Sequence, residues 1–153
     1  MNSRAPGGRG PDAMSSGPRG VLEGLRILIV DDDGDARELL KTIFSQRRAV
    51  VFAAESVAEA MDLLERERPD VLVSDIAMPE EDGYTLIRRL RALAPERGGR
   101  TPAIALTAYA GSADRARALA AGFDRYFSKP LDLDALLDAL IDVRSAAAIG
   151  AGG

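Results

Sequence analysis

The sequence predicts an α/β fold in which an open parallel sheet carries helices on both faces. Five short apolar runs alternate with five amphipathic segments along the 153 residues. In such an alternation each crossover between parallel strands is right-handed and lays a helix over the sheet. A closed barrel needs more repeating units than this chain contains. The pattern therefore predicts a doubly wound, five-stranded parallel sheet.

The predicted strands are short, rich in aliphatic residues and bounded by polar residues, as expected for buried strands of a parallel sheet. The first stops at Asp31, Asp32 and Asp33, and the third stops at Asp75. The five runs are Leu25–Val30, Val50–Ala53, Asp70–Ser74, Ala103–Thr107 and Asp124–Ser128.

Apolar residues at helical spacing follow the first two strands. The first predicted helix ends near Arg47 and Arg48, where the helix dipole favours positive charge. Ser56 and Glu59 have the spacing of a capping box at the start of the second helix, and Pro69 ends it. The apolar positions are Ala36, Leu39, Leu40, Ile43 and Phe44 in the first helix, and Val57, Ala60, Met61 and Leu64 in the second.

Three further helices are predicted from capping residues and apolar spacing. The third begins at Asp82 or Gly83, and Pro95–Arg100 after it is predicted to be a polar loop. Ser112 is the predicted N-cap of the fourth helix and Gly122 its C-cap. The inward residues are Leu86, Ile87, Leu90 and Leu93 in the third helix, and Leu133, Leu136, Leu137, Leu140 and Ile141 in the last.

Composition excludes several classes of function. With 46% hydrophobic residues the chain can form a core, and its net charge of −4 gives no electrostatic footprint for nucleic acid. The absence of Cys and His excludes thiolate sites, most zinc sites and a histidine general base. No apolar run approaches the roughly 20 residues of a membrane span, and no secretory signal is present. We expect a soluble, cytoplasmic protein.

The chain divides into one domain and two terminal segments. Residues 1–20 are rich in Gly, Pro, Ser and Arg, and we expect a disordered tail or linker. A docking arm is the alternative for this mildly basic segment. The domain is expected over residues 21–146, and residues 147–153 are expected to fray.

Polar side chains follow four of the predicted strands. Because parallel strands end at one edge of the sheet, these residues are expected to meet there: Asp31, Asp32, Asp33, Asp75, Thr107 and Lys129. Crowded carboxylates raise one another's pKa unless a cation neutralises them. Since all the donors are oxygens, the expected metal is hard, Mg²⁺ or Mn²⁺.

A carboxylate beside such a cation can accept a phosphoryl group and form an aspartyl phosphate. A lysine and a hydroxyl would then contact the transferring oxygens. The alternative for Asp31 and Asp32 is simple helix capping, the role we assign to Asp33 and Asp35. A calcium loop is rejected, because Gly34 falls at the fourth position rather than the sixth.

Four motifs together resemble the response regulator receiver domain, the CheY-like family of two-component signalling. They are ILIVDDD at Ile27–Asp33, VLVSDIAMPEEDG at Val71–Gly83, ALTAYA at Ala105–Ala110 and YFSKP at Tyr126–Pro130. The resemblance covers about residues 25–144. It implies a flavodoxin-like (βα)5 fold with strand order 2-1-3-4-5.

The resemblance also implies roles for individual residues. Asp75 is the expected phosphoacceptor, and Thr107 and Lys129 are expected to contact the phosphoryl group. Asp32 and Asp75 would be direct Mg²⁺ ligands, with Asp31 acting mostly through water. The expected third ligand is the backbone carbonyl of Ala77.

Three further expectations come from the family pattern. The Lys129–Pro130 peptide is expected to be cis. Tyr126 occupies the aromatic switch position that moves with Thr107, with plain packing as the alternative. Ala77 cannot orient water and Tyr109 would cover the pocket, so we expect a longer-lived phosphoryl group than with polar residues at these positions.

The expected function is therefore that of a phosphoaccepting receiver, which catalyses only its own phosphorylation and dephosphorylation. Its donor would be a phosphohistidine on a sensor histidine kinase or a histidine phosphotransfer domain. The amino-acid sequence of Ala105–Asp132 resembles that of receiver domains attached to hybrid histidine kinases. The alternatives are an unphosphorylated interaction module and an aspartyl-phosphate hydrolase of the haloacid dehalogenase type. The hydrolase needs a second Asp where this chain has Ala77.

Overall fold

The computed structural model describes residues 22–78, 81–108 and 111–152 of the chain. The predicted N-terminal tail and Tyr109 lie outside the described residues. The elements follow the chain as β1 (Arg26–Val30), α1 (Gly34–Gln46), β2 (Val50–Ala54), α2 (Val57–Glu67), β3 (Val71–Asp75), α3 (Gly83–Ala92), the 3₁₀ helix η1 (Pro95–Arg97), β4 (Ala103–Thr107), α4 (Ser112–Ala121), β5 (Arg125–Ser128) and α5 (Leu133–Gly152).

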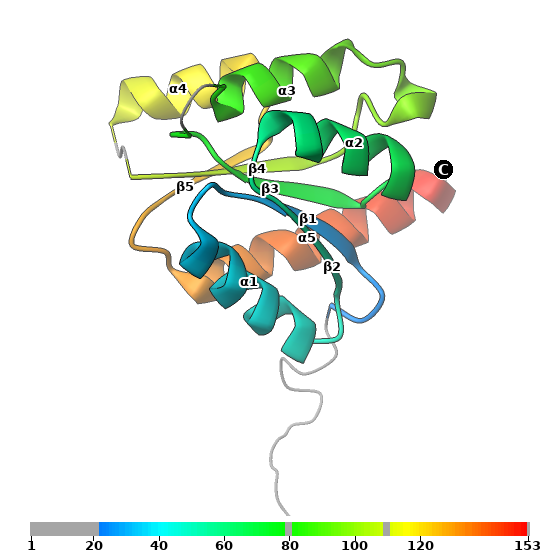
Figure 1. The fold of residues 1–153 in the computed structure, drawn as a ribbon. Helices are drawn as coiled ribbons and strands as arrows, with labels where there is room; N and C mark the ends of the chain where they lie inside the picture. Colours follow the sequence, from blue (N-terminus) through cyan, green and yellow to red (C-terminus); the bar gives the residue numbers. More distant parts are fainter. Residues whose placement is uncertain (1–21, 79–80, 109–110, 153) are drawn as a thin grey trace, which may run out of the picture.

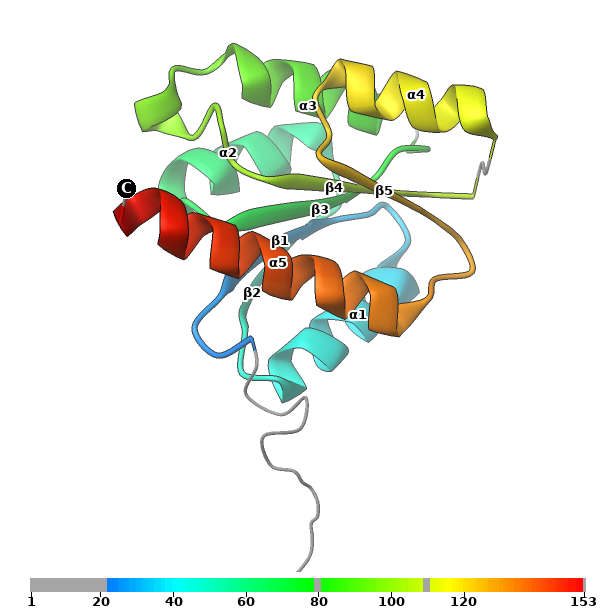
Figure 2. The ribbon, with the colours of Figure 1, turned by 180° about the vertical axis from the view of Figure 1, so that it is seen from behind.

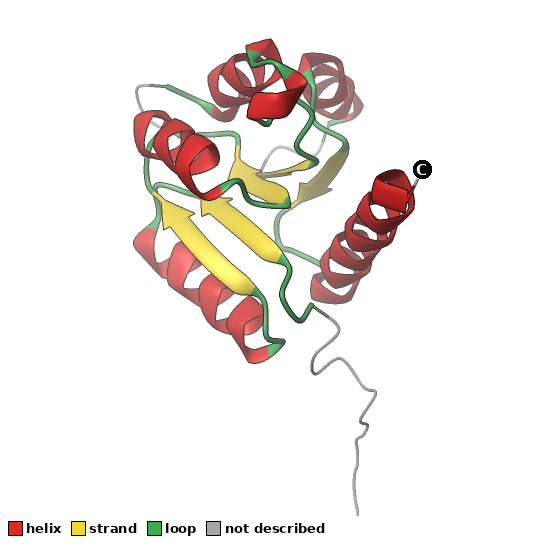
Figure 3. Ribbon diagram, turned by 90° about the vertical axis from the view of Figure 1, so that its right-hand side faces the viewer, coloured by secondary structure: helices red, strands yellow, loops and turns green. Residues whose placement is uncertain are grey.

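The five strands form one parallel sheet in the order β2-β1-β3-β4-β5, which confirms the predicted fold class and strand order. Helices α2, α3 and α4 cover one face, and α1 and α5 cover the other (Figure 1, and from behind in Figure 2). The side view in Figure 3 shows the sheet between these two layers. All four pairings between neighbouring strands are parallel, so the carboxyl ends of the strands lie at one edge.

The sheet has a hydrophobic core on each face, because alternate residues of a strand point to opposite sides. Leu28 and Val30 of β1 pack with α2 and α3 residues such as Leu64 and Leu86. Ile27 and Ile29 of the same strand belong to the opposite core, which includes these buried side chains of α1 and α5: Leu40, Phe44, Leu136, Leu137 and Leu140. β3 and β4 are buried along their whole length, as expected for central parallel strands.

The capping box of α2 forms with one change from the predicted geometry. The N–H of Glu59 donates to Ser56 Oγ (3.2 Å), as predicted. The Glu59 carboxylate accepts from the N–H of Glu55 (2.9 Å), one residue before the cap. Two N–H groups near the helix start are therefore satisfied.

Three details differ from the sequence predictions. Gly111, not Ser112, is the N-cap of α4, because Gly111 has the extended backbone of a cap and the helix begins at Ser112. The predicted loop after α3 contains η1, whose first residue, Pro95, has the φ that a helical turn needs. Leu39 is 61% exposed, since it lies about 100° around α1 from the buried Leu40.

α5 also extends further than the sequence pattern suggests. It runs to Gly152 and so includes residues for which a frayed end is expected. In α4, by contrast, the end of the helix is as predicted: Gly122 is its C-cap, with φ at +128°.

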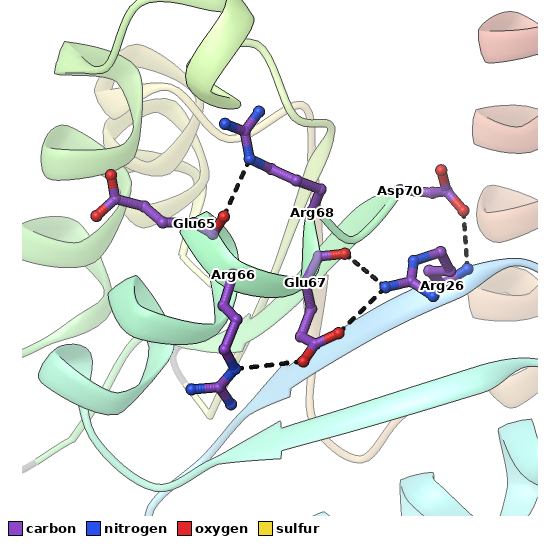
Figure 4. Close-up of polar contacts among 6 residues, drawn as sticks. All are labelled: Arg26, Glu65, Arg66, Glu67, Arg68 and Asp70. Atoms are coloured by element: carbon purple, nitrogen blue, oxygen red, sulfur yellow. Dashed lines mark hydrogen bonds and ion pairs between the residues drawn. The ribbon is translucent and has the colours of Figure 1, made fainter.

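The amino end of β1 is tied to its neighbours by Arg26 (Figure 4). The backbone N–H of Arg26 donates to the Asp70 carboxylate (2.8 Å). Its guanidinium donates to the Glu67 carbonyl (2.6 Å) and pairs with the Glu67 carboxylate (3.4 Å). The start of β1, the end of α2 and the start of β3 are thereby held together at the edge opposite the polar strand ends.

Gly83 lets α3 approach the end of β3. A Cβ at this position would lie 2.6 Å from the Asp75 carbonyl oxygen and 2.8 Å from Ile76 Cα. Both neighbours are backbone atoms, so they cannot move aside as a flexible side chain would. The position of α3 against the strand end therefore depends on a residue without a side chain.

We predict that Gly83→Ala lowers the free energy of unfolding by about 1–3 kcal/mol, the usual cost of overpacking. Gly34→Ala is the matched control, because its Cβ would meet only the Arg37 side chain at 3.5 Å. Urea unfolding of the two variants measures the difference. Equal stability of Gly83→Ala and Gly34→Ala would contradict the proposed steric role.

Candidate functional site

The register of the sheet brings the predicted site residues to one edge. Val30 is paired with Ser74, so Asp31 and Asp75 follow neighbouring positions on β1 and β3. Asp75 in turn is paired with Leu106, the residue before Thr107. The backbone N–H of Lys129 donates to the Thr107 carbonyl (2.7 Å), which places Lys129 beside the end of β4. Residues more than 40 positions apart in the chain thus converge, as Figure 1 shows for the loops after β1, β3 and β5.

Asp31, Asp32 and Asp75 form a cluster of carboxylates. One oxygen from each lies within 4.8 Å of the others. Asp31 and Asp75 are buried, with 2% and 7% exposure, while Asp32 is exposed. A set of oxygen donors, buried on one side and open on the other, fits a hard divalent cation that keeps several waters. The three predicted carboxylate ligands are therefore close enough to share one ion.

Lys129 supplies positive charge to the two buried carboxylates. Its Nζ lies 3.6 Å from Asp31 Oδ2 and 3.7 Å from Asp75 Oδ2. The lysine side chain is 33% exposed, whereas that of Asp31 is 2% exposed. The following peptide, Lys129–Pro130, is cis, as predicted.

The Asp75 carboxyl has a pKa raised from 3.8 to about 6. Burial is the main cause, and the negative charges of Asp31 and, to a smaller extent, Asp32 act in the same direction. The Lys129 ammonium and a hydrogen bond from the backbone of Ala77 oppose the shift. Ionisation of Asp75 therefore costs free energy in the folded protein, and a further positive charge nearby would lower that cost.

The loop after β1 is held by its own backbone and side chains. The N–H of Asp33 donates to Asp31 Oδ1 (2.9 Å), which orients the Asp31 carboxylate. Asp33 itself caps α1 by accepting from the N–H groups of Asp35 and Ala36, as predicted. The capping role therefore belongs to Asp33 and leaves Asp31 and Asp32 for the cluster.

Thr107 and Ala77 border a cavity of about 320 Å³ beside the carboxylate cluster. Thr107 is 1% exposed, whereas the Ala77 side chain is exposed and carries no polar group. The far wall contains Tyr84 and Arg117, whose guanidinium lies 4.1 Å from the centre of the Tyr84 ring. Neither Tyr84 nor Arg117 is among the site residues predicted from the sequence. Tyr84 is a buried core residue, and no motif in the sequence marks Arg117.

Tyr126 is half-buried and packs against the core on the α2–α4 face. Burial raises the pKa of its hydroxyl, and the negative charge of Asp114 adds to the shift. This position is compatible with both roles predicted for Tyr126, the switch and plain packing.

Arg37 is a further neighbour of the cluster that the sequence pattern did not single out. Its Nη1 donates to the Asp31 carbonyl (2.8 Å). The only hint in the sequence is spacing, since Arg37 lies one helical turn after Asp33.

Comparison with known proteins identifies the family. Residues 27–141 match the model of the response regulator receiver domain. The chain belongs to this family. Receiver domains are the phosphoacceptor domains of two-component signalling.

Individual relatives agree with this assignment. An uncharacterised 14.6 kDa protein of Leptolyngbya boryana is 51% identical over 112 residues, covering 73% of this chain and 84% of the relative. The response regulator MprA of Mycobacterium avium is 40% identical over 113 residues, covering 74% of this chain but 48% of the regulator. The receiver domain thus matches about half of the MprA sequence.

Solved structures show the same fold. The receiver domain of the Francisella response regulator 1452 superimposes with a TM-score of 0.72 at 29% identity, covering 79% of this chain and 97% of that one. The agreement extends over nearly the whole of the solved domain.

The raised pKa of Asp75 predicts how stability depends on pH. Because the folded-state pKa lies above the unfolded value, protonated Asp75 stabilises the fold below about pH 4, and this contribution is lost as the pH rises to about 6. Asp75→Asn stays neutral throughout. In buffer free of divalent cations at pH 7 we expect this variant to be more stable by about 1–3 kcal/mol.

Urea unfolding between pH 4 and pH 8 measures this effect, and the difference between wild type and variant should shrink toward pH 4. Asp62→Asn, on the exposed face of α2, is the control and should change little. Equal or lower stability of Asp75→Asn at pH 7 would show that the Asp75 carboxylate is not strained by its neighbours.

Proposed function

We propose that this receiver domain accepts a phosphoryl group from a phosphohistidine of a partner protein onto Asp75. Asp31, Asp32, Asp75 and the backbone carbonyl of Ala77 would hold Mg²⁺, or Mn²⁺, during the transfer. The observation that carries the proposal is the position of Asp75, which is buried at the carboxyl edge of the sheet and shares the Lys129 ammonium with Asp31. A sensor histidine kinase or a histidine phosphotransfer domain would supply the phosphohistidine.

The transfer needs a nucleophile and stabilised negative charge. An Asp75 carboxylate oxygen attacks phosphorus, the phosphorus–nitrogen bond breaks, and its electron pair stays on the imidazole of the partner. Lys129, already 3.7 Å from Asp75 Oδ2, is placed to neutralise a phosphoryl oxygen. The Thr107 hydroxyl would donate to another. When bound, the cation neutralises phosphoryl charge and lowers the cost of ionised Asp75.

A change in Thr107 and Tyr126 would pass the signal on. Thr107 is buried at the end of β4, and Tyr126 lies on the neighbouring strand β5, where it pairs with Ala105. A dianionic phosphoryl group at Asp75 adds strong hydrogen-bond acceptors close to Thr107. Movement of Thr107 toward them would free space next to Tyr126 and change the surface around α4 and β5.

A groove next to Lys129 supports a protein as the donor. It has a volume of about 470 Å³ and is lined mainly by apolar side chains of α1 and the segment before α5. Leu39, 61% exposed, lies in this groove together with Lys129. Exposed apolar surface beside a reactive group suits a partner that must bring its phosphohistidine close to Asp75.

The location in the cell stays a prediction. Within the described part of the chain, no helix is both long enough and apolar enough to cross a membrane. The cytoplasm remains the expected compartment for the proposed exchange with a histidine kinase.

Two other functions are less well supported. An aspartyl-phosphate hydrolase would need an acid or base two residues after the nucleophile, where the chain has Ala77. An inert interaction module would have no need of a buried, raised-pKa carboxylate beside a lysine, which costs stability. Receiver domains are not generally classical enzymes, and we propose only self-phosphorylation and dephosphorylation for this chain.

Incubation with acetyl phosphate and Mg²⁺ tests the proposal. We expect one phosphoryl adduct by mass spectrometry, absent from Asp75→Asn and from samples with excess chelator. Lys129→Met should reduce its formation by about 10²-fold or more, because one charge-stabilising group is removed. Arg115→Met, on the exposed surface of α4, is the control. No adduct would indicate the inert module, and turnover of external phosphoesters the hydrolase.

The apolar side chain at position 77 predicts slow loss of the phosphoryl group. Ala77 borders the cavity that is also lined by Thr107 and by Ile76, the residue after Asp75. An amide in its place can hold a water by hydrogen bonds, so Ala77→Asn should lose phosphate several-fold faster than wild type. The decay of the adduct after donor removal measures this. Ala77→Val controls for size, and a decay of Ala77→Asn no faster than wild type would contradict the explanation.

A further inference from the structure

Arg37, on the first turns of α1, joins two loops beside the carboxylate cluster. Its Nη1 donates to the backbone carbonyl of Asp31 (2.8 Å). Its Nη2 lies 3.6 Å from Glu55 Oε2, on the turn between β2 and α2. The Arg37 side chain is only 20% exposed, whereas that of Glu55 is 67% exposed. The guanidinium is thus held over the loop after β1.

The carbonyl that Arg37 contacts belongs to a residue whose other polar groups are also engaged. The N–H of Asp31 donates to the Ala54 carbonyl (3.1 Å), and its carboxylate accepts from the N–H of Asp33. With Arg37 on the carbonyl, the backbone of Asp31 is held from both sides. Asp32 follows directly, so these contacts also hold the backbone from which its exposed carboxylate extends.

The positive charge of Arg37 lies close to the proposed cation site. A guanidinium beside a cation site repels a divalent ion, so its charge alone would weaken metal binding. The neighbouring cavity, lined by Asp32, Glu55 and Glu81, is acidic, and Arg37 lies at its edge through the Glu55 contact. Charge and geometry therefore predict opposite effects of removing Arg37.

We propose that Arg37 is a positioning residue for the metal site. By holding the Asp31 carbonyl and linking it to the β2–α2 turn, it keeps the Asp31 and Asp32 carboxylates in the arrangement that binds Mg²⁺. This gain outweighs the repulsion between its charge and the ion. The inference rests on the proposed binding of Mg²⁺ by Asp31, Asp32 and Asp75.

The sign of the change in Mg²⁺ affinity tests the proposal. Arg37→Met removes both the charge and the hydrogen bond, and we expect the Mg²⁺ Kd to rise about tenfold, as for other residues that orient metal ligands. Arg89→Met is the matched control. Arg89 pairs with Glu81 (2.9 Å) at the same acidic cavity, and among the described residues its side chain has no hydrogen bond or ion pair to the loop after β1. Its loss should leave the Kd unchanged or lower it about twofold.

Isothermal titration of the unphosphorylated proteins with MgCl₂ gives these constants, with circular dichroism to verify folding. Arg37→Lys keeps the charge but not the two-pronged contact, so we expect a Kd between those of wild type and Arg37→Met. If Arg37→Met does not fold, Arg37→Lys alone decides. A Kd that falls in Arg37→Met, or stays at the wild-type value in Arg37→Lys, would overturn the positioning role.

The outcome separates this inference from the proposed function. Wild-type protein that binds no Mg²⁺ and forms no adduct on Asp75 would refute the function itself. If wild type binds Mg²⁺, the inference also predicts that Arg37→Met still forms the adduct from acetyl phosphate when Mg²⁺ is raised well above its new Kd. Failure at saturating Mg²⁺ would instead mean that Arg37 acts on the phosphoryl group, and the positioning role would be wrong.

Discussion

The repulsion between two buried carboxylates is the constraint on which the rest of the site depends. Asp31 and Asp75 are both almost fully buried and share the ammonium of Lys129 at 3.6 and 3.7 Å. Burial is the main cause of the raised pKa of Asp75, and the negative charge of Asp31, which Lys129 only partly offsets, adds to it. A bound divalent cation would stabilise the ionised carboxylates of such a site. The electrostatic free energy that the free protein spends on holding them together would then favour binding of the cation.

The parallel sheet maintains this arrangement. Its central strands are buried along their length, and their register places Asp31, Asp75 and Thr107 at successive strand ends. On the opposite edge Arg26 ties β1 to α2 and β3. Gly83 then lets α3 close against the end of β3. Repulsion within the cluster is therefore resisted by packing and backbone hydrogen bonds that lie outside it.

Much of this could be predicted because the signals are local or periodic. Buried strands appear as aliphatic runs, and polar residues after them must meet at one edge, so Asp31, Asp32, Asp75, Thr107 and Lys129 were found together. Predictions that depended on a single residue were less secure. Ser112 looked like a cap, yet the extended backbone of Gly111 takes that role. Leu39 fitted the helical spacing, yet it lies outside the buried stripe of α1.

The fold class, the strand order implied by the family motifs, and the identity of the polar groups at the carboxyl edge can all be predicted from the sequence. These features follow from residue type and spacing, which can be read directly from the sequence. The interactions among those groups become visible only in the folded protein: the lysine shared by Asp31 and Asp75, the raised pKa of Asp75, and the contact of Arg37 with the Asp31 carbonyl. Burial and distance between residues far apart in the chain depend on how the layers pack, and no local pattern encodes them.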